Sequence, residues 1–215
     1  MVHLIKSPNL DIDLSSGYHS KKVDQGGAAY PLQHDYVENY TFINDVFTDL
    51  DIQKIIKIGE EIELSKGLIG SSYDSSIRNC FVNFLYPNHI TSWIFEKLRS
   101  AIVQANNSHF NFHLSSLEEG LQFTRYEAPS QHYTWHVDRG KGMSVRKLSL
   151  SVQLSGPEEY EGGDLELSFG EHPVVAPKQK GIVALFPSYV VHRVAPVTKG
   201  TRYSLVCWVS GPPFR

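Results

Sequence analysis

Two different spacings of apolar residues divide the chain at about residue 120. Before that point the spacing is helical, beginning at Thr48, which forms a capping-box pattern with Asp51. The first predicted helix has an apolar face made of Ile52, Ile55, Ile56 and Ile62. A second helix is predicted over residues 91–106, ending at Asn106-Asn107, with a stripe of Ile94, Leu98, Ala101, Ile102 and Ala105.

After residue 120 the apolar positions alternate with polar ones, which is typical of β-strands. The alternation is clear over residues 121–127 and 148–154, and Gly/Pro turns separate the later segments. Further short strands are predicted at 164–168, 181–186, 189–195 and 202–209. Helices followed by many short strands predict an α+β fold with a β-sandwich or barrel. The wide strand spacing favours a double-sheet jelly roll.

Residues 1–37 show neither periodicity and contain few bulky apolar side chains. We interpret them as an N-terminal arm, either flexible or folded over the body like a lid. The remaining residues, 38–215, are predicted to form a single domain.

Composition narrows the possible functions. The 215 residues are 41% apolar and 20% charged, which excludes global disorder. Because 20 Lys and Arg oppose 23 Asp and Glu, we expect no nucleic-acid partner bound mainly by charge. The two cysteines, Cys80 and Cys207, exclude a disulfide framework and a cysteine-based zinc ribbon or iron–sulfur cluster. Without a signal-like or membrane-spanning apolar run, we expect a cytoplasmic protein with no membrane partner.

Three residues have the pattern of a metal site. His136 and Asp138 are two apart on an extended segment and therefore point to the same side. His192 can supply a third ligand from a later strand. Two histidines and one carboxylate form the facial triad that binds Fe(II) and leaves coordination positions open. A His-x-Asp pair also occurs in ordinary surface turns, so this pattern needs support from elsewhere in the chain.

Arg202 and Ser204 provide a second signal, ten residues beyond His192. On a strand they share a face with Val206 and Trp208. Arginine can bind a carboxylate through two parallel hydrogen bonds, and serine adds a hydroxyl donor. The competing interpretation is an arginine at the start of a strand that faces solvent. The other arginines considered, Arg125, Arg146 and Arg193, are expected to form ordinary salt bridges, and His109 and His113 to be structural.

These residues together resemble the iron- and 2-oxoglutarate-dependent dioxygenases. The distance from Asp138 to His192, with 53 residues between them, is typical of that superfamily. The chain is most similar to the prolyl 4-hydroxylase-like branch, in particular the bacterial and phage PKHD-type hydroxylases. The resemblance covers residues 40–215 and depends on segments 121–126, 131–138, 148–155, 160–165, 185–188 and 191–194.

The resemblance implies a double-stranded β-helix with Fe(II) on His136, Asp138 and His192. It implies 2-oxoglutarate as co-substrate, bound by Arg202 with help from Ser204 and from Tyr126 or Gln153, with Ser151 the next candidate on that face. Oxidative decarboxylation would be coupled to hydroxylation of a substrate C–H bond by dioxygen, with ascorbate as a reductant. A prolyl residue in a peptide or protein is the first substrate expected, followed by a free amino acid or another small molecule.

Three alternatives remain open at this level. The same chemistry could act on a nucleic acid, which the acidic charge balance disfavours. A non-catalytic jelly-roll binding module would have no need of a complete triad together with Arg202. A zinc hydrolase on the same three ligands would not explain Arg202 and Ser204. The sequence carries no signal for the oligomeric state.

Overall fold

The computed structural model describes residues 12–13, 37–70, 72–140, 143 and 145–213. Its described helices are α1 (Asp49–Glu61), α2 (Ser92–Ala105) and the short π-helix η2 (Asn106–Phe110). Both predicted α-helices are therefore present. None of the helices in this part of the chain is long and apolar enough to cross a membrane.

The major sheet has seven strands on its main path, and all of its pairings are antiparallel. Their order is β2 (Thr41–Ile43), β13 (Val183–Pro187), β9 (Arg146–Gln153), β15 (Val197–Ser210), β7 (Leu121–Glu127), β5 (Phe81–Leu85) and β3 (Ser65–Lys66). Three short strands join at the side, namely β1 (Ile12–Asp13), β6 (Ser116–Leu117) and β10 (Tyr160–Gly162).

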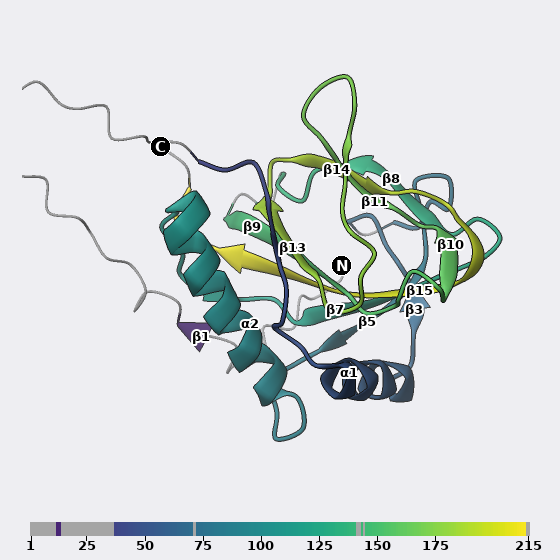
Figure 1. The fold of residues 1–215 in the computed structure, drawn as a ribbon, viewed down its shortest axis with the longest axis horizontal. Helices are drawn as coiled ribbons and strands as arrows, with labels where there is room; N and C mark the ends of the chain where they lie inside the picture. The colour runs from purple at the N-terminus through teal and green to yellow at the C-terminus, as the bar shows by residue number, and fades with distance from the viewer. Residues whose placement is uncertain (1–11, 14–36, 71, 141–142, 144, 214–215) are drawn as a thin grey trace, which may run out of the picture.

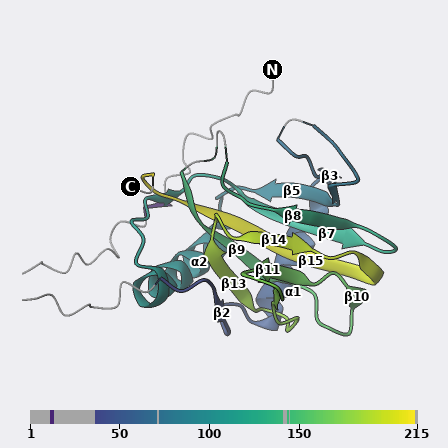
Figure 2. The same cartoon turned by 90° about the horizontal axis from the view of Figure 1, so that it is seen from above.

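A second, antiparallel sheet of five strands faces the major one. Its order is β12 (Val174–Val175), β11 (Leu165–Ser168), β14 (Val191–Val194), β8 (His132–His136) and β4 (Arg78–Asn79). Figure 1 shows α1 and α2 outside the strands, with β8, β11 and β14 of the second sheet above β5, β7 and β15 of the major one, and Figure 2 shows the molecule turned by 90°. The molecule therefore has helices, a major sheet and a minor sheet in successive layers.

The central strands of the major sheet are buried on both faces. All eight residues of β9 are buried. Its apolar residues Leu148, Leu150 and Val152 belong to the main core, which also contains the buried residues of α1 and α2. The alternate residues of β9 are polar and point the other way, toward the minor sheet. A separate, smaller apolar cluster lies there, formed by Cys80, Val82, Tyr126, Tyr160, Leu165, Ala176, Ala184, Val194 and Val197.

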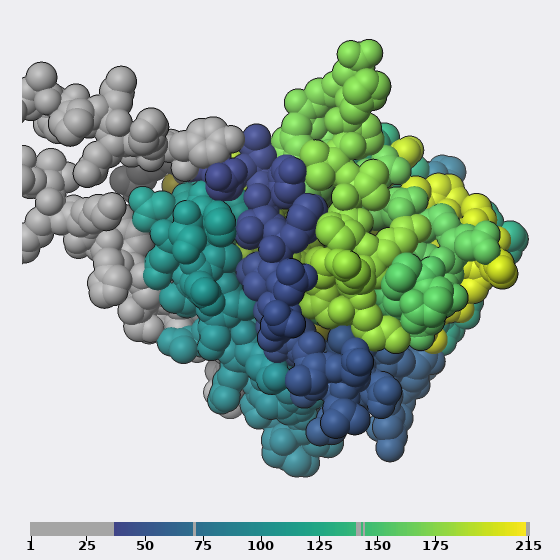
Figure 3. Space-filling model, viewed as in Figure 1, coloured from purple at the N-terminus to yellow at the C-terminus, as the bar shows by residue number. Residues whose placement is uncertain are grey.

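The segment that precedes α1 closes the edge of the major sheet. In β2, Thr41 pairs with Leu185 and Ile43 with Val183. The space-filling view shows the chain from residue 37 as a band between α2 and the β13 region (Figure 3). Val37 and Ile43 pack against the main core. The edge strand on this side is therefore β2, which has only three residues, and a short edge strand offers little for another chain to pair with.

The predicted helix boundaries are mostly confirmed, with one correction. Thr48 and Asp51 form the expected capping box at the start of α1. The predicted stop at Asn106-Asn107 is wrong in detail, because the chain continues as η2 to Phe110 and ends in Asn111, with a left-handed φ of 52°. The Asn106 side chain exchanges hydrogen bonds with the main chain of Phe112, and both distances are 2.9 Å. These bonds end the helical segment one turn later than predicted.

The predicted strands appear with shifted ends. The strand predicted at 181–186 begins only at Val183, because Gly181 has a φ of 87° and forms a turn. The strand predicted at 202–209 is the centre of the longer β15. Strands β2, β5 and β8 were not predicted. Both cysteines are buried, as expected.

The predicted arm lies mostly outside the described residues. Within it, the structure describes Ile12, Asp13 and Val37. Ile12 and Asp13 pair antiparallel with Leu117 and Ser116 of β6, and Val37 packs against the main core. The boundary drawn near residue 38 therefore stays a prediction.

The Asp51 carboxylate joins the two helices and provides a test of their packing. It accepts a hydrogen bond from the Thr48 main-chain N–H at 2.9 Å and one from Lys97 Nζ at 2.7 Å. The bond from Lys97 lowers the pKa of Asp51 to about 2, against an opposing effect of burial. The ionised carboxylate therefore stabilises the fold fully above about pH 4, and this contribution is lost as the pH falls toward 2.

We expect Asp51→Asn to lower the free energy of unfolding by about 1 kcal/mol near neutral pH, because the cap and the ion pair are both weakened. Urea titrations of both proteins at about pH 7 and about pH 3 measure the difference. The difference should shrink at the lower pH. A difference that stayed constant would show that the carboxylate charge is not involved.

Candidate active site

Three potential metal ligands converge between the two sheets. His136 ends β8, Asp138 follows it, and His192 lies on β14, directly opposite His136 in the pairing of the two strands. The distance from His136 Nε2 to Asp138 Oδ1 is 3.7 Å, and that from His192 Nε2 to Asp138 Oδ2 is 3.4 Å. One ligand atom from each residue lies within 4.8 Å of the other two. The structure thus brings together all three residues predicted as ligands.

Both imidazoles are oriented by main-chain carbonyl groups. Nδ1 of His136 lies 2.7 Å from the Thr134 oxygen, and Nδ1 of His192 lies 2.9 Å from the Val190 oxygen. Because only a protonated Nδ1 can donate to a carbonyl, each Nε2 carries the free lone pair that a metal needs. Burial, followed by the neighbouring His192, lowers the pKa of His136 to about 4. His136 is therefore neutral at neutral pH.

Asp138 is held as a carboxylate. Burial acts to raise its pKa, but His192, His136 and a hydrogen bond from Ser149 outweigh burial and lower the pKa below its usual value. Ser149 Oγ donates to Asp138 Oδ2 at 2.7 Å, and Ser188 Oγ lies 3.0 Å from Ser149 Oγ. The site therefore offers two imidazole nitrogens and one anionic oxygen, which is a donor set suited to Fe(II).

Sequence periodicity alone missed the aromatic residues that surround the cluster. The Tyr133 ring stacks on His136 with 3.5 Å between ring centroids, and Phe186 lies 4.7 Å from the His192 ring. His136 of β8 pairs with His192 of β14, and Tyr133 pairs with Val194. The paired residues are three apart on β8 but only two apart on β14, so β8 contains one extra residue, a β-bulge. The bulge brings Tyr133 to the same face as His136 despite a spacing of three.

Arg202 lies in the same interior and has no charged partner. Only 1% of it is exposed, and its Nε atom is buried without a hydrogen-bond partner. Its Nη1 atom donates to Ser204 Oγ at 3.3 Å, and its guanidinium lies 5.6 Å from the Tyr126 ring centroid. Among the described residues, no carboxylate forms an ion pair with it. A buried cation without a counter-ion is costly, so the position is suited to an anion from outside the chain.

The chain comes very close to Arg202 at a pair of glycines. Gly162 and Gly163 have φ angles of 71° and 61°. A Cβ atom on Gly163 would lie 3.1 Å from Arg202 Cδ and 2.9 Å from Val197 Cγ2. Both the left-handed backbone and the contact therefore require glycine at position 163.

The other predicted pocket residues lie on the same inner face. Tyr126 of β7 is opposite Arg202 of β15, and Gln153 of β9 is opposite Ser204. The buried Gln153 amide nitrogen donates to the Ser155 oxygen and to the Tyr160 hydroxyl, both at 2.9 Å. This amide nitrogen is thus already used by protein groups. Tyr160, which the sequence analysis did not single out, is the residue it meets.

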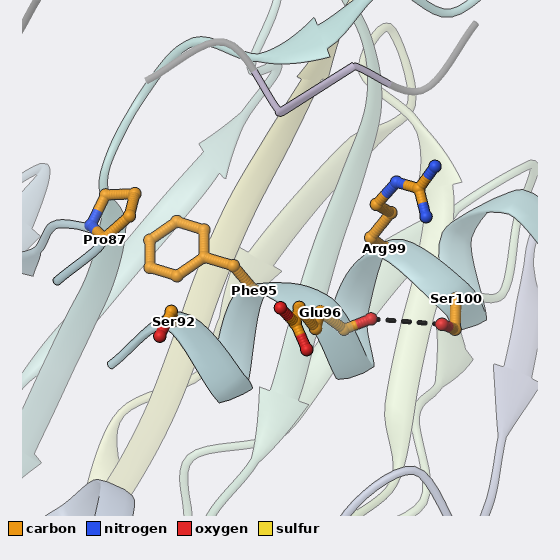
Figure 4. Close-up of a pocket in the computed structure, with 6 residues that line it drawn as sticks. All are labelled: Pro87, Ser92, Phe95, Glu96, Arg99 and Ser100. Carbon is orange, nitrogen blue, oxygen red and sulfur yellow. Dashed lines mark hydrogen bonds between the residues drawn. The ribbon is translucent and has the colours of Figure 1, made fainter. Parts of the chain in front are cut away.

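The remaining arginine candidates are paired, as expected. Arg125 pairs with Glu60, Arg146 with Glu119 and Arg193 with Glu166. A cavity of about 480 Å³ lies away from the metal cluster, along α2 and the residue Pro87 before it (Figure 4). Its lining includes Phe95, Glu96 and Arg99 but no residue of the triad. We assign no function to this cavity.

Comparison with known proteins agrees with this geometry. Residues 121–210 match the model of the 2OG-Fe(II) oxygenase superfamily. The matched segment contains the three clustered ligands and Arg202.

Curated proteins similar to the chain are named PKHD-type hydroxylases. A PKHD-type hydroxylase of Janthinobacterium sp. (strain Marseille) is 45% identical over 96 residues, covering 40% of this chain and 41% of the relative. A PKHD-type hydroxylase of Nitrosomonas europaea is 35% identical over 124 residues, covering 52% and 53%. One from Escherichia coli is 33% identical over 129 residues, covering 55% and 56%. The chain thus spans about half the length of the curated relatives it matches.

Solved structures with the same fold confirm the predicted jelly roll. A Trichoplax adhaerens prolyl hydroxylase, in complex with a peptide fragment of hypoxia inducible factor, matches with a TM-score of 0.70 at 16% identity, over 81% of this chain and 84% of the other. A Pseudomonas putida prolyl-4-hydroxylase has a TM-score of 0.65 at 18% identity, over 81% and 94%. At these identities the likeness establishes the fold alone.

The unpaired burial of Arg202 leads to a stability prediction. Arg202→Met should raise the free energy of unfolding of the ligand-free protein by about 1–3 kcal/mol, because a buried charge without a partner is replaced by an apolar chain. Thermal and urea unfolding measure this change. Arg125→Met serves as the control: its Arg is paired with Glu60, so it should give no gain. Destabilisation by Arg202→Met would mean that the guanidinium has an internal anionic partner.

Proposed function

We propose that this protein is an Fe(II)- and 2-oxoglutarate-dependent dioxygenase that hydroxylates a substrate C–H bond. One observation carries the proposal. The convergent cluster of His136, Asp138 and His192 shares one interior with the buried, unpaired Arg202. A metal site and an anion site on the inner surface of one jelly roll suit a co-substrate with a metal-binding end and a carboxylate end.

The residues of the cluster fit iron. His136 and His192 each present Nε2, and Asp138 presents a carboxylate that Ser149 orients. With bound iron and 2-oxoglutarate, this chemistry converts dioxygen, 2-oxoglutarate and a substrate C–H bond into succinate, carbon dioxide and a hydroxylated product. The protein residues bind and orient the participants and keep water out of the interior.

Arg202 is proposed to bind the distant carboxylate of 2-oxoglutarate. Its free Nε and its neighbour Ser204 provide donors, and the Tyr126 ring lies 5.6 Å from the guanidinium, on the neighbouring strand β7. In a buried site such charge-assisted bonds are strong. The hydrogen bond between Gln153 and Tyr160 forms part of the wall of the same interior, beside Ser204. We retain ascorbate as the proposed reductant.

For the substrate, we propose a prolyl residue in a peptide or protein. The support is the similarity to PKHD-type hydroxylases and the peptide complex of the Trichoplax prolyl hydroxylase that has the same fold. A free amino acid or another small molecule is the second candidate. Succinate release stimulated by proline-containing peptides, with mass spectrometry showing the gain of one oxygen atom, tests the first. Stimulation by free amino acids alone would favour the second.

The unpaired Arg202 also bears on the competing functions. A zinc hydrolase has no use for a buried anion site beside the metal. A binding module that had lost catalysis would not need a complete triad. A net charge of -3 gives no support for a nucleic-acid substrate.

Removal of any metal ligand should abolish turnover. We expect His136→Ala, Asp138→Ala and His192→Ala each to lose iron-dependent succinate production and metal binding, because open metal sites need their full set of protein ligands. Calorimetric titration with Mn(II) and a succinate assay measure the two losses. His109→Ala, which lies outside the cluster, is the control. Near-normal turnover in Asp138→Ala would refute the assignment.

Arg202 should control the affinity for 2-oxoglutarate. Arg202→Ala is expected to raise the apparent KM for 2-oxoglutarate at least tenfold, since losing a buried charge-assisted contact costs roughly 2–5 kcal/mol. Arg202→Lys should restore only part of the affinity, because lysine cannot form the two-pronged contact. If both variants bind 2-oxoglutarate as the parent does, another cation holds its carboxylate.

A further inference from the structure

Arg146 lies beside the metal cluster and touches a metal ligand through the main chain. It is the first residue of β9 and is only 6% exposed. Its Nη1 atom donates to the Asp138 carbonyl oxygen at 3.1 Å. Its Nε atom donates to Glu119 Oε1 at 2.6 Å, and Nη2 donates to Glu119 Oε2. Its guanidinium also lies 3.9 Å from the Trp208 ring centroid.

Asp138 needs such support because it lies outside the regular strands. Strand β8 ends at His136, two residues earlier. The main-chain N–H groups of Asp138 and Arg139 both donate to the Ser188 carbonyl oxygen at 3.1 Å. Ser149 holds the carboxylate. Arg146 supplies the remaining contact, to the carbonyl group of Asp138. Side chain, N–H and C=O of this one residue are therefore each held by a different neighbour.

Arg146 is itself rigidly placed. The Glu119 carboxylate accepts from two of its nitrogens, a geometry that fixes the plane of the guanidinium. The Trp208 ring covers its face, and Trp208 belongs to the central strand β15. Glu119 also neutralises its charge, so Arg146 is not an open anion site like Arg202. Its hydrogen bond to the Asp138 carbonyl oxygen is therefore a structural contact.

We propose that Arg146 is a positioning residue that keeps Asp138 in place for metal binding, with Glu119 and Trp208 fixing Arg146. This inference rests on the proposed function, because it assumes that Asp138 binds the metal. Neighbours that orient metal ligands typically contribute about 10–100-fold to metal affinity. Loss of Arg146 should therefore weaken metal binding while leaving the co-substrate pocket around Arg202 intact.

The chain offers a matched control. Arg125 also pairs with a glutamate through two contacts, from Nη1 to the Glu60 oxygens at 2.8 and 3.1 Å, and lies 5.2 Å from the Phe81 ring centroid. It combines the same kinds of interaction as Arg146, but no hydrogen bond links it to a metal ligand. Comparing Arg146→Met with Arg125→Met separates the contact with Asp138 from the general loss of a salt bridge.

The test is calorimetric titration of the full chain with Mn(II), followed by titration with 2-oxoglutarate at saturating Mn(II). We expect Arg146→Met to bind Mn(II) at least about tenfold more weakly than the parent. Arg125→Met should stay within about twofold, because it leaves the metal ligands untouched. Affinity for 2-oxoglutarate at saturating Mn(II) should stay within about threefold in both variants, because Arg202 is unchanged. Equal Mn(II) affinities of the two variants would overturn the proposal.

Two conservative variants keep the test decisive if Arg146→Met does not fold. Arg146→Lys retains the charge but cannot reach Glu119 and Asp138 together, so its Mn(II) affinity should lie between those of the parent and Arg146→Met. Glu119→Gln should weaken Mn(II) binding more mildly. Parental affinity in both variants contradicts the inference. The variant His136→Ala separates failure of the metal site from failure of the role of Arg146. If Mn(II) binding survives this change, the metal site itself is refuted.

Discussion

The central strands of the major sheet are covered on both faces, and the rest of the structure depends on this two-sided burial. On one face, Leu148, Leu150 and Val152 pack with α1 and α2 in the main core. On the other, Ser149, Ser151 and Gln153 are buried toward the minor sheet. Successive side chains of a strand point to opposite faces of the sheet. The apolar residues of β9 face the helices, and its alternate, polar residues therefore lie in the space between the sheets. The candidate active site lies in that polar lining.

A buried polar lining is stable only if its groups are satisfied. Most are satisfied by the protein itself: Gln122 donates to Thr124, Gln153 donates to Tyr160, and Ser149 donates to Asp138. On this inner face of β15, Arg202 Nε and Trp208 Nε1 are buried without a hydrogen-bond partner. An anion bound to Arg202 would satisfy the first of these and balance the guanidinium charge.

Local pattern was sufficient to predict the helices, most of the later strands and the clustering of the ligands. The alternation in 148–154 and 202–209 assigned the inner faces correctly, because a period of two determines which side chains share a face. It could not locate β8, whose bulge breaks that period and hides the relation between Tyr133 and His136. Nor could it predict Ser188 or the contact between Arg146 and Asp138, since these depend on how distant turns meet in space.

Strand β15 has a consequence for the length of what can bind. It is a single strand of 14 residues, and it carries both Arg202 and Trp208 on the same face. Trp208 lies opposite Ser149, the residue that donates to the Asp138 carboxylate, and Arg202 lies further along the strand. Because β7 and β9 are hydrogen-bonded to β15 on its two sides, the strand keeps the spacing between these positions constant. A ligand that binds both to Arg202 and to the metal ligands is therefore selected by its length as well as by its charge.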